Sequence, residues 1–215
     1  MKEKWFKGLS VLYHSAVKIT GEQVVYLDPY ALQGEPRDGD VIFITHGHYD
    51  HFSKEDLEKV RKADSWIVVP EDLKKEALSM GFSRERVIGV RPGEKGRAAG
   101  VAFEAVWAYN KEKPFHPKEN QWVGYVVTLN GIRYYIAGDT DMTEENRNIS
   151  CDVALVPVGG TYTMDPSEAA ALVNELKPTG AVPTHYGCIV GNKEDGDAFK
   201  KRLSSEIDCR LLLSF

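Results

Sequence analysis

The segment Val41-Ile42-Phe43-Ile44-Thr45-His46-Gly47-His48-Tyr49-Asp50-His51 places three histidines and an aspartate directly after an apolar run. The apolar run is typical of a short buried strand, and Ser53, followed by Lys54-Glu55-Asp56-Leu57, predicts the start of a helix. The histidines therefore lie on a loop between a strand and a helix, where a rigid scaffold can present side chains to a cleft.

The spacing of these side chains predicts metal binding. Residues i and i+2 of an extended segment share a face, so His46 and His48 can point at one ion. As the chain turns toward the helix, Asp50 and His51 are directed at a second ion. Imidazole and carboxylate groups are the ligands that Zn²⁺ takes at about 2.0–2.2 Å. A solvated polar loop is the alternative, but half of the chain's six histidines fall in this one loop.

Length and composition limit the class of protein. With 215 residues, 42% hydrophobic and 27% charged, we expect one globular domain over residues 1–215. The formal charge of −5 gives no bulk attraction to phosphate backbones, so no nucleic-acid partner is expected.

Location and partners follow from what the sequence does not contain. No run approaches the roughly 18 apolar residues of a membrane span, and the N-terminus lacks the apolar core of a secretory signal. The three cysteines are odd in number and widely spaced, which indicates neither a disulfide framework nor a Cys-x-x-Cys site. We expect a cytoplasmic protein with a small-molecule substrate; the sequence leaves the oligomeric state open.

The hydrophobic pattern alternates strands and helices along the chain. Strands are expected at residues 9–19, 23–27, 41–44, 66–69, 101–107, 122–129, 132–137, 152–158, 180–184 and 207–213. Helices are expected at residues 53–62, 71–81, 166–177 and 193–203. Asn130-Gly131 predicts a tight hairpin, and Asp165-Pro166-Ser167-Glu168 predicts a capped helix start with a capping box. Two mixed β-sheets packed face to face, with helices on the outer faces, would bury all of the apolar faces, which is an α/β αββα sandwich.

Further ligands are expected on other loops that follow strands. Asp139, after the strand at 132–137, carries two oxygens and could bridge two cations. His185 follows the strand at 180–184. Taken singly, Asp139 is compatible with a turn residue and His185 with a structural histidine.

The loop after residues 101–107 contributes His116. His46, His48 and His116 would then hold one ion, and Asp50, His51 and His185 the other, with Asp139 between them. The alternative for the first ion is that Asn110 and water complete its shell in place of His116.

With these residues assembled, the sequence resembles the metallo-β-lactamase-fold hydrolase superfamily. The resemblance is carried by Asp28-Pro29, by His46-x-His48-x-Asp50-His51, by Gly138-Asp139-Thr140 and by His185, in the family's order, from about residue 9 to about residue 190. It implies the αββα sandwich, with the site at the sheet edges. Tyr13-His14-Ser15-Ala16 on the first strand resembles a branch that includes ascorbate-6-phosphate lactonase and N-acyl phosphatidylethanolamine phospholipase D.

Departures from the family pattern narrow what is expected. The true zinc β-lactamases have a cysteine in place of Asp139, so antibiotic hydrolysis is not expected. The di-iron flavoprotein branch has a glutamate in place of His48, so redox chemistry is not expected either. The family's third histidine normally follows the strand directly, where this chain has Tyr109-Asn110.

The expected function is that of a metal-dependent hydrolase. A hydroxide bridging two divalent ions would cleave an ester, lactone or phosphoester-type bond in a small anionic substrate. Zn²⁺ is favoured, and Mn²⁺ or Fe²⁺ also suits these ligands. A phosphodiesterase or nuclease acting on nucleotides or RNA, and a non-catalytic metal-binding protein, are the alternatives.

Roles can be assigned to individual residues on this hypothesis. Asp50 is the expected catalytic residue, orienting the nucleophile and carrying its proton. Lys118 and Tyr186 are expected to contact an anionic group of the substrate. The residues expected to hold the ligands in place are His14, Asp28, Asn110 and Thr184.

Overall fold

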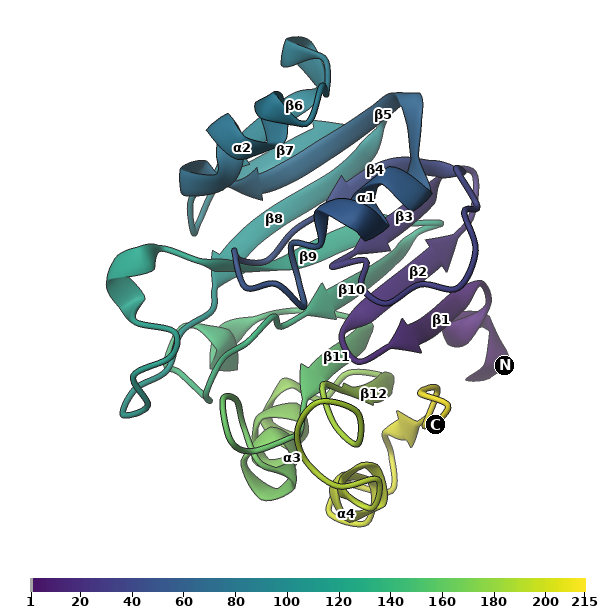
Figure 1. The fold of residues 1–215 in the computed structure, drawn as a ribbon. Helices are drawn as coiled ribbons and strands as arrows, with labels where there is room; N and C mark the ends of the chain where they lie inside the picture. Colours follow the sequence, from purple (N-terminus) through teal and green to yellow (C-terminus); the bar gives the residue numbers. More distant parts are fainter. Residues whose placement is uncertain (1) are drawn as a thin grey trace.

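The computed structural model describes residues 2–215 and contains two β-sheets, each built from a separate half of the chain (Figure 1). The first sheet runs in sequence order through β1 (Leu9–Tyr13), β2 (Ala16–Thr20), β3 (Val24–Leu27), β4 (Gly39–Phe43), β5 (Arg61–Pro70) and β6 (Val87–Val90). The second sheet has the order β13 (Asp208–Cys209), β12 (Gly180–Thr184), β11 (Val153–Pro157), β10 (Ile132–Ile136), β9 (Val123–Leu129), β8 (Val101–Trp107) and β7 (Lys95–Ala98). The α-helices are α1 (Lys54–Val60), α2 (Lys74–Ser79), α3 (Pro166–Leu176) and α4 (Asp195–Lys200).

Both sheets are mixed, as expected from the sequence. Neighbouring strands pair antiparallel from β1 through β3 and from β7 through β10. They pair parallel from β3 through β6 and from β10 through β13. The parallel strands direct their carboxyl ends to one edge of each sheet, which is where their following loops gather.

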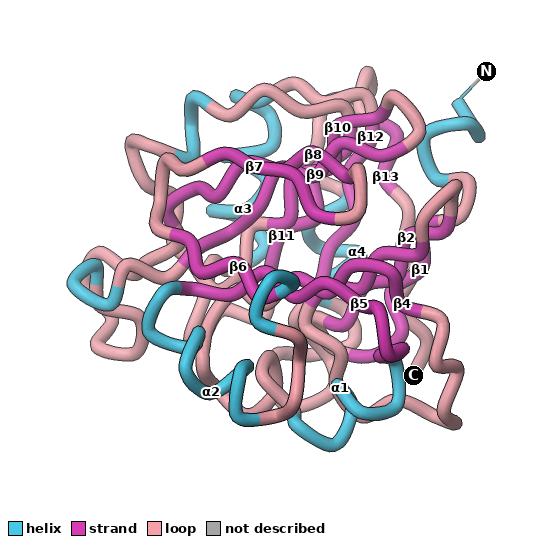
Figure 2. Tube along the Cα trace, turned by 90° about the horizontal axis from the view of Figure 1, so that it is seen from above, coloured by secondary structure: helices cyan, strands magenta, loops and turns pink. Residues whose placement is uncertain are grey.

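Alternation of side chains along β4 explains the layers. Val41 and Phe43 face the second sheet and join the core around Tyr125, while Ile42 and Ile44 face the opposite way. The latter pack with Leu57 and other apolar residues of α1 and α2. Figure 2 shows α1 and α2 along one side of the first sheet and the second sheet on its other side. Helices α3 and α4 contact β11 and β12, completing the expected αββα sandwich.

Several local predictions are confirmed. The β9–β10 hairpin turns at Asn130 and Gly131, whose φ angles of 54° and 73° are those of a type I′ turn. Helix α3 begins at Pro166, and the Asp165 carboxylate accepts hydrogen bonds from the backbone N–H groups of Ser167 and Glu168. The capping box is wrong in one respect, since the Glu168 side chain accepts a hydrogen bond from the backbone N–H of Met142 instead.

Other boundaries differ from the prediction. Residues 9–19 form two strands, because the chain turns at His14, whose φ is 52°. Strands β6 and β7 were not expected: β6 contains Gly89 and β7 is largely polar. Helix α4 is shorter than residues 193–203, and only Asp208–Cys209 of residues 207–213 pairs as a strand.

Two hydrogen bonds tie the sheets together beside the His46–His51 loop. The backbone N–H of Val123 donates to the carbonyl of Thr45 at 3.1 Å, and the Tyr125 hydroxyl donates to the carbonyl of Ile44 at 2.7 Å. These contacts fix the end of β4 against the start of β9, so the loop that follows β4 begins from a rigid position. Within residues 2–215, no helix is both long and apolar enough to cross a bilayer.

Candidate metal centre

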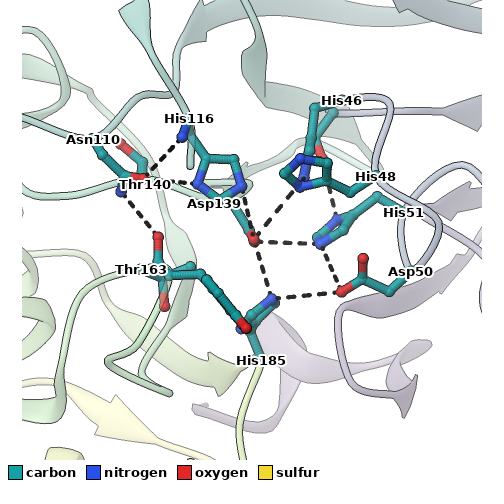
Figure 3. Close-up of polar contacts among 12 residues, drawn as sticks. His46, His48, Asp50, His51, Asn110, His116, Asp139, Thr140, Thr163 and His185 are labelled. Carbon is teal, nitrogen blue, oxygen red and sulfur yellow. Dashed lines mark hydrogen bonds and ion pairs between the residues drawn. The ribbon is translucent and has the colours of Figure 1, made fainter. Parts of the chain in front are cut away.

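Loops from both sheets bring the expected ligands to one place (Figure 3). The His46–His51 loop follows β4 of the first sheet. Three loops of the second sheet supply the remaining ligands: His116 between β8 and β9, Asp139 after β10 and His185 after β12. All seven expected ligands therefore converge, although they are spread over 140 residues of sequence.

His46, His48 and His116 form one group. Their ligand atoms all lie within 4.8 Å of one another, close to the separation of two ligands on one ion with bonds of about 2.0–2.1 Å. Nε2 of His46 lies 3.0 Å from Nδ1 of His48. The sequence predicts that these three imidazoles share an ion, and the structure brings them together.

The remaining expected ligands, Asp50, His51 and His185, form a second group around the Asp139 carboxylate. Within it, the ligand atoms of Asp50 and His185 also lie within 4.8 Å of those of His14, and the ligand atoms of His51 and Asp139 lie within 4.8 Å of that of His46. The Nε2 atoms of His51 and His185 are 3.6 and 3.8 Å from the same Asp50 oxygen. The same nitrogens lie 3.4 and 3.1 Å from the Asp139 carboxylate. Asp139 also lies 3.3 Å from Nε2 of His116, so its two oxygens face both groups of imidazoles.

Several of these ligand atoms are buried with no hydrogen-bond partner among the described residues. They include Nε2 of His51, Nε2 of His116 and Oδ1 of Asp139. A buried polar atom without a partner costs about 1–3 kcal/mol, and structures rarely contain several in one place. Imidazole nitrogens and a carboxylate with unused lone pairs are the donor set of a divalent metal site, so the residues present fit metal ions.

Burial and mutual proximity shift the pKa values in the cluster. Burial lowers the pKa of His46 well below its ordinary value, and the neighbouring His51 lowers it further. Burial would also lower the pKa of His51, but the carboxylates of Asp139 and Asp28 outweigh it and raise that pKa well above the ordinary value. Burial would raise the pKa of Asp139, yet His185 and His51 hold it well below the usual range. The cluster thus keeps its carboxylate ionised, as a metal ligand must be.

Asp28 and Thr45 orient the histidines of the first loop. Nδ1–H of His51 donates to the Asp28 carboxylate at 2.8 Å, so Nε2 is the ring nitrogen that faces the cluster. The Thr45 hydroxyl donates to the same carboxylate at 2.7 Å and lies 3.0 Å from Nδ1 of His46. The sequence predicted this contribution from Asp28. It missed Thr45, although Thr45 is the residue directly between the strand and His46.

Asn110 performs the same task for His116. Its amide oxygen lies 2.8 Å from Nδ1 and 3.1 Å from the backbone N–H of His116, both of which donate to it. Its amide nitrogen donates to Asp141 at 3.1 Å and to the carbonyl of Tyr162 at 2.9 Å. The loop therefore folds back so that His116 reaches the cluster while the Asn110 amide is used in hydrogen bonds.

His14 lies beneath the second group of ligands. It is fully buried, its Nε2 lies 3.3 Å from the Asp50 carboxylate, and its ring centroid lies 3.9 Å from that of His185. Its backbone carbonyl accepts a hydrogen bond from the backbone N–H of His185 at 3.0 Å. Burial lowers the pKa of His14 to about 4, so the ring is neutral at pH 7. His14 therefore supports both Asp50 and His185.

Among the described residues, the side chains of Lys118, Tyr186 and Thr184 make no polar contact with the expected ligands. The Lys118 ammonium donates to the Glu145 carboxylate at 2.6 Å and lies over the ring of Trp107. Tyr186 is buried, and burial raises its pKa to about 12. Thr184 pairs through its backbone, accepting a hydrogen bond from Val158 at 3.0 Å.

Trp122 is a neighbour of the cluster that sequence reasoning did not identify. Its ring centroid lies 5.0 Å from those of both His46 and His48, and 5.7 Å from that of His116. Its indole N–H donates to Asp72 at 3.2 Å, outside the ligand groups. The indole therefore packs against one side of the group formed by His46, His48 and His116.

A pocket of about 240 Å³ opens onto the ligands, with His48, Asp50, His116, Asp139 and His185 in its lining. A larger hollow of about 630 Å³ lies beside α1, but its charged side chains pair with one another, as in Lys59 with Glu55 and Arg61 with Glu58. Of these two, the smaller pocket is the one whose lining includes ligand atoms without a hydrogen-bond partner among the described residues, so it is the candidate site.

Comparisons with known proteins agree with this geometry. The family model for a β-lactamase superfamily domain matches residues 8–185. A UPF0173 metal-dependent hydrolase of Thermococcus kodakarensis is 32% identical over 214 residues, covering 94% of each chain. A UPF0173 metal-dependent hydrolase of Methanosphaerula palustris is 29% identical over 210 residues, covering 93% of each chain.

Solved structures share the fold. A crystal structure from Parabacteroides distasonis superposes with a TM-score of 0.80 at 29% identity, covering 95% of this chain and 91% of that one. Igni18, a metallo hydrolase from Ignicoccus hospitalis, superposes with a TM-score of 0.77 at 24% identity, covering 94% and 93%. The family match and the relative that is 32% identical over almost the whole length show that this chain belongs to the metallo-β-lactamase-fold hydrolase superfamily.

Proposed function

We propose that this protein is a hydrolase that holds two divalent ions and cleaves an ester, lactone or phosphoester-type bond in a small molecule. His46, His48 and His116 would hold one ion, Asp50, His51 and His185 the other, and Asp139 would lie between them. The observation that carries the proposal is the convergence of these seven side chains, among which Nε2 of His51, Nε2 of His116 and Oδ1 of Asp139 are buried and have no hydrogen-bond partner within residues 2–215. The names of the relatives support the same activity.

The chemistry needs a nucleophile at neutral pH. When bound, two such ions would lower the pKa of a water toward about 7 and stabilise negative charge on a substrate oxygen. Zn²⁺ is the proposed metal because the ligands are imidazole nitrogens and carboxylate oxygens, and Mn²⁺ or Fe²⁺ would also be compatible.

Asp50 is the proposed proton carrier. It lines the pocket and one of its oxygens faces His14, His51 and His185. Burial would raise its pKa, but the contact with His14 and the neighbouring His51 lower it, so the carboxylate is ionised at neutral pH. It can then accept a hydrogen bond from the attacking water and take its proton. His14 is proposed to hold Asp50 in that orientation.

The remaining residues keep the imidazoles in one tautomer. Asp28, Thr45 and Asn110 each occupy the Nδ1 side of one histidine, so the Nε2 sides of His51, His46 and His116 point at the cluster. We propose that His116, rather than Asn110, completes the first ion's ligands, since the Asn110 amide is already engaged on both sides.

Metal content per chain, measured by mass spectrometry on untagged protein, tests the proposal directly. We expect about two ions per chain in the wild type and about one in His116→Ala. One ion or none in the wild type, unchanged by the substitution, would contradict the dinuclear site.

Activity is tested by screening the metal-loaded protein against lactones, carboxylic esters and phosphodiesters. Asp50→Ala should abolish turnover while circular dichroism shows an intact fold. Full activity in that variant would exclude the proposed role of Asp50.

A polynucleotide substrate finds less support. Binding of a phosphate backbone uses several lysine and arginine contacts, and the net charge of the chain is −5. A low-salt pull-down with a steep dependence of RNA binding on salt would reopen that alternative.

A further inference from the structure

Aromatic and aliphatic side chains surround the ligands at the mouth of the pocket. They are Tyr49, Phe115, Tyr162, Ile189 and Val190, which come from four different loops. Phe115 and Tyr162 meet edge to face, with ring centroids 4.6 Å apart, and so form one wall. Apart from the ligands themselves, the described lining of this pocket consists of these five residues.

This mouth collects much of the protein's exposed apolar surface. Six large hydrophobic side chains are exposed in the described part of the chain, and three of them lie here: Tyr49 at 65%, Phe115 at 41% and Ile189 at 38%. Exposed apolar side chains that gather in one place, rather than singly, mark a binding site. Because these side chains border the candidate ligands directly, a substrate bound at the ligands would contact them.

No lysine or arginine lines this pocket within residues 2–215. The two nearest lysines in sequence to His116 are engaged elsewhere: Lys113 pairs with Asp141 and donates to the carbonyl of Thr163, and Lys118 pairs with Glu145. Proteins recognise the carboxylate or phosphate of a ligand mainly with arginine and lysine. Metal ions would bind the reacting oxygen, but the rest of the substrate meets neutral side chains.

We propose that the substrate is a compact, uncharged carboxylic ester or lactone, whose apolar portion lies against Tyr49, Phe115 and Ile189. The inference rests on the proposed hydrolytic function and replaces the expectation of an anionic substrate. In the reaction, the water oxygen bonds to the acyl carbon and the bond from the acyl carbon to the alkoxy oxygen breaks. One water proton goes to that alkoxy oxygen to give the alcohol, and the other is released when the carboxylic acid ionises. The volume of about 240 Å³ is below the roughly 300–1,000 Å³ of pockets for drug-sized ligands, which limits the substrate to a small molecule.

Two esters with four-carbon acyl chains that differ at the far end test the charge preference, each rate being corrected for spontaneous hydrolysis because a free carboxylate at that end attacks its own ester. p-Nitrophenyl butyrate ends in a methyl group, and mono-p-nitrophenyl succinate ends in a carboxylate. We expect kcat/KM of the metal-loaded protein to favour the butyrate by about tenfold or more, as expected for a neutral apolar pocket.

Ile189→Lys places a cation at the mouth, and Leu211→Lys is its control, since Leu211 is equally exposed at 37% and lies outside the pocket lining. Ile189→Lys should lower the butyrate-to-succinate ratio by about tenfold, whereas Leu211→Lys should leave it unchanged. A wild-type preference for the succinate, or an Ile189→Lys ratio equal to that of the control, would overturn the proposal.

Binding separates this inference from the function on which it rests. Butyranilide and succinanilic acid are the amide counterparts of the two esters, and ligand-observed NMR on the metal-loaded protein ranks them without turnover. Tighter binding of butyranilide than of succinanilic acid, with a smaller difference in Ile189→Lys, supports the apolar pocket. If neither ester is hydrolysed in that case, the proposed ester hydrolysis is contradicted but the apolar pocket is not. Tighter binding of succinanilic acid overturns the apolar pocket whatever the esters show.

Discussion

Asp139 and Asp141 lie two positions apart in one loop, and each is 4% exposed, yet their surroundings are opposite. The Asp141 carboxylate accepts hydrogen bonds from the Asn110 amide at 3.1 Å, from the backbone N–H of Lys111 at 3.0 Å and from the Lys113 ammonium. Asp139 faces imidazoles from both halves of the chain, and one of its oxygens has no hydrogen-bond partner among the described residues. Burial alone therefore does not distinguish the two carboxylates, whereas the unpartnered oxygen of Asp139 among the proposed ligands does.

The strongest way to test this contrast is to neutralise each carboxylate in turn. Asp139→Asn removes the charge between the two proposed ions, so we expect loss of at least one ion per chain and at least about a hundredfold loss of hydrolysis. Asp141→Asn should retain about two ions per chain. Metal content and turnover, measured for both variants, test whether the two carboxylates differ in this way. Equal metal content and equal rates in both would remove the distinction.

A smaller effect is expected at Asp28, which touches a ligand but not the proposed ions. Asp28→Asn weakens the hold on Nδ1 of His51, and we expect metal affinity to fall about 10–100-fold in competition with a chelating dye. Asp56→Asn is the matched control, because Asp56 is also buried and accepts backbone hydrogen bonds from Ala31 and Leu32, but makes no hydrogen bond to a proposed ligand among the described residues. An Asp28→Asn affinity no lower than that of the control would contradict the role assigned to Asp28.

Substitution of Asp141 is expected to change the free energy of unfolding rather than the metal content. Asp141→Ala leaves the backbone N–H of Lys111 without its acceptor and removes one of the two acceptors of Lys113 and of the Asn110 amide, so we expect the free energy of unfolding to fall by about 1–3 kcal/mol. Urea unfolding of the chelator-treated protein measures this without a contribution from metal. A change below about 0.5 kcal/mol would mean that the loop is held by its other contacts.

The smallest effect is expected at Glu145, a carboxylate near the surface. Burial would raise its pKa, but hydrogen bonds from Lys118 and Tyr109 lower it to about 2. A folded-state pKa below the unfolded value stabilises the protein above pH about 4.5, and this stabilisation is lost as the pH falls toward about 2. Glu145→Gln should therefore lower the melting temperature by less than about 3 °C at pH 7, and by still less at pH 3. A larger difference in melting temperature between wild type and Glu145→Gln at pH 3 than at pH 7 would contradict the lowered pKa of Glu145.

The fold and the convergence of the expected ligands could be predicted because both follow simple patterns. Apolar runs marked most strands, and each expected ligand follows a strand, where side chains at a sheet edge meet. The turn at His14 could not be predicted, since residues 9–19 contain no glycine or asparagine and the turn requires a histidine with φ of 52°. Strand β7 was missed because an edge strand of polar residues has no apolar signal.

The residues that surround the expected ligands were harder to predict. Thr45, Trp122 and Asp141 act through contacts between loops, and nothing in their sequence neighbourhood specifies those contacts. Lys118 was expected near the substrate because it is two residues from His116, but its ammonium extends to Glu145. Sequence proximity to a ligand therefore did not indicate the direction of a long side chain.

Each sheet consists of one half of the chain, and each proposed ion would take ligands from both halves. The ions would thus act as removable cross-links between two halves that otherwise adhere through their packed faces and a few hydrogen bonds. Metal supply would then set the lifetime of the protein as well as its activity, because a protein without its ions opens more often and exposes its interior to proteases. A cell short of metal would lose the molecule itself.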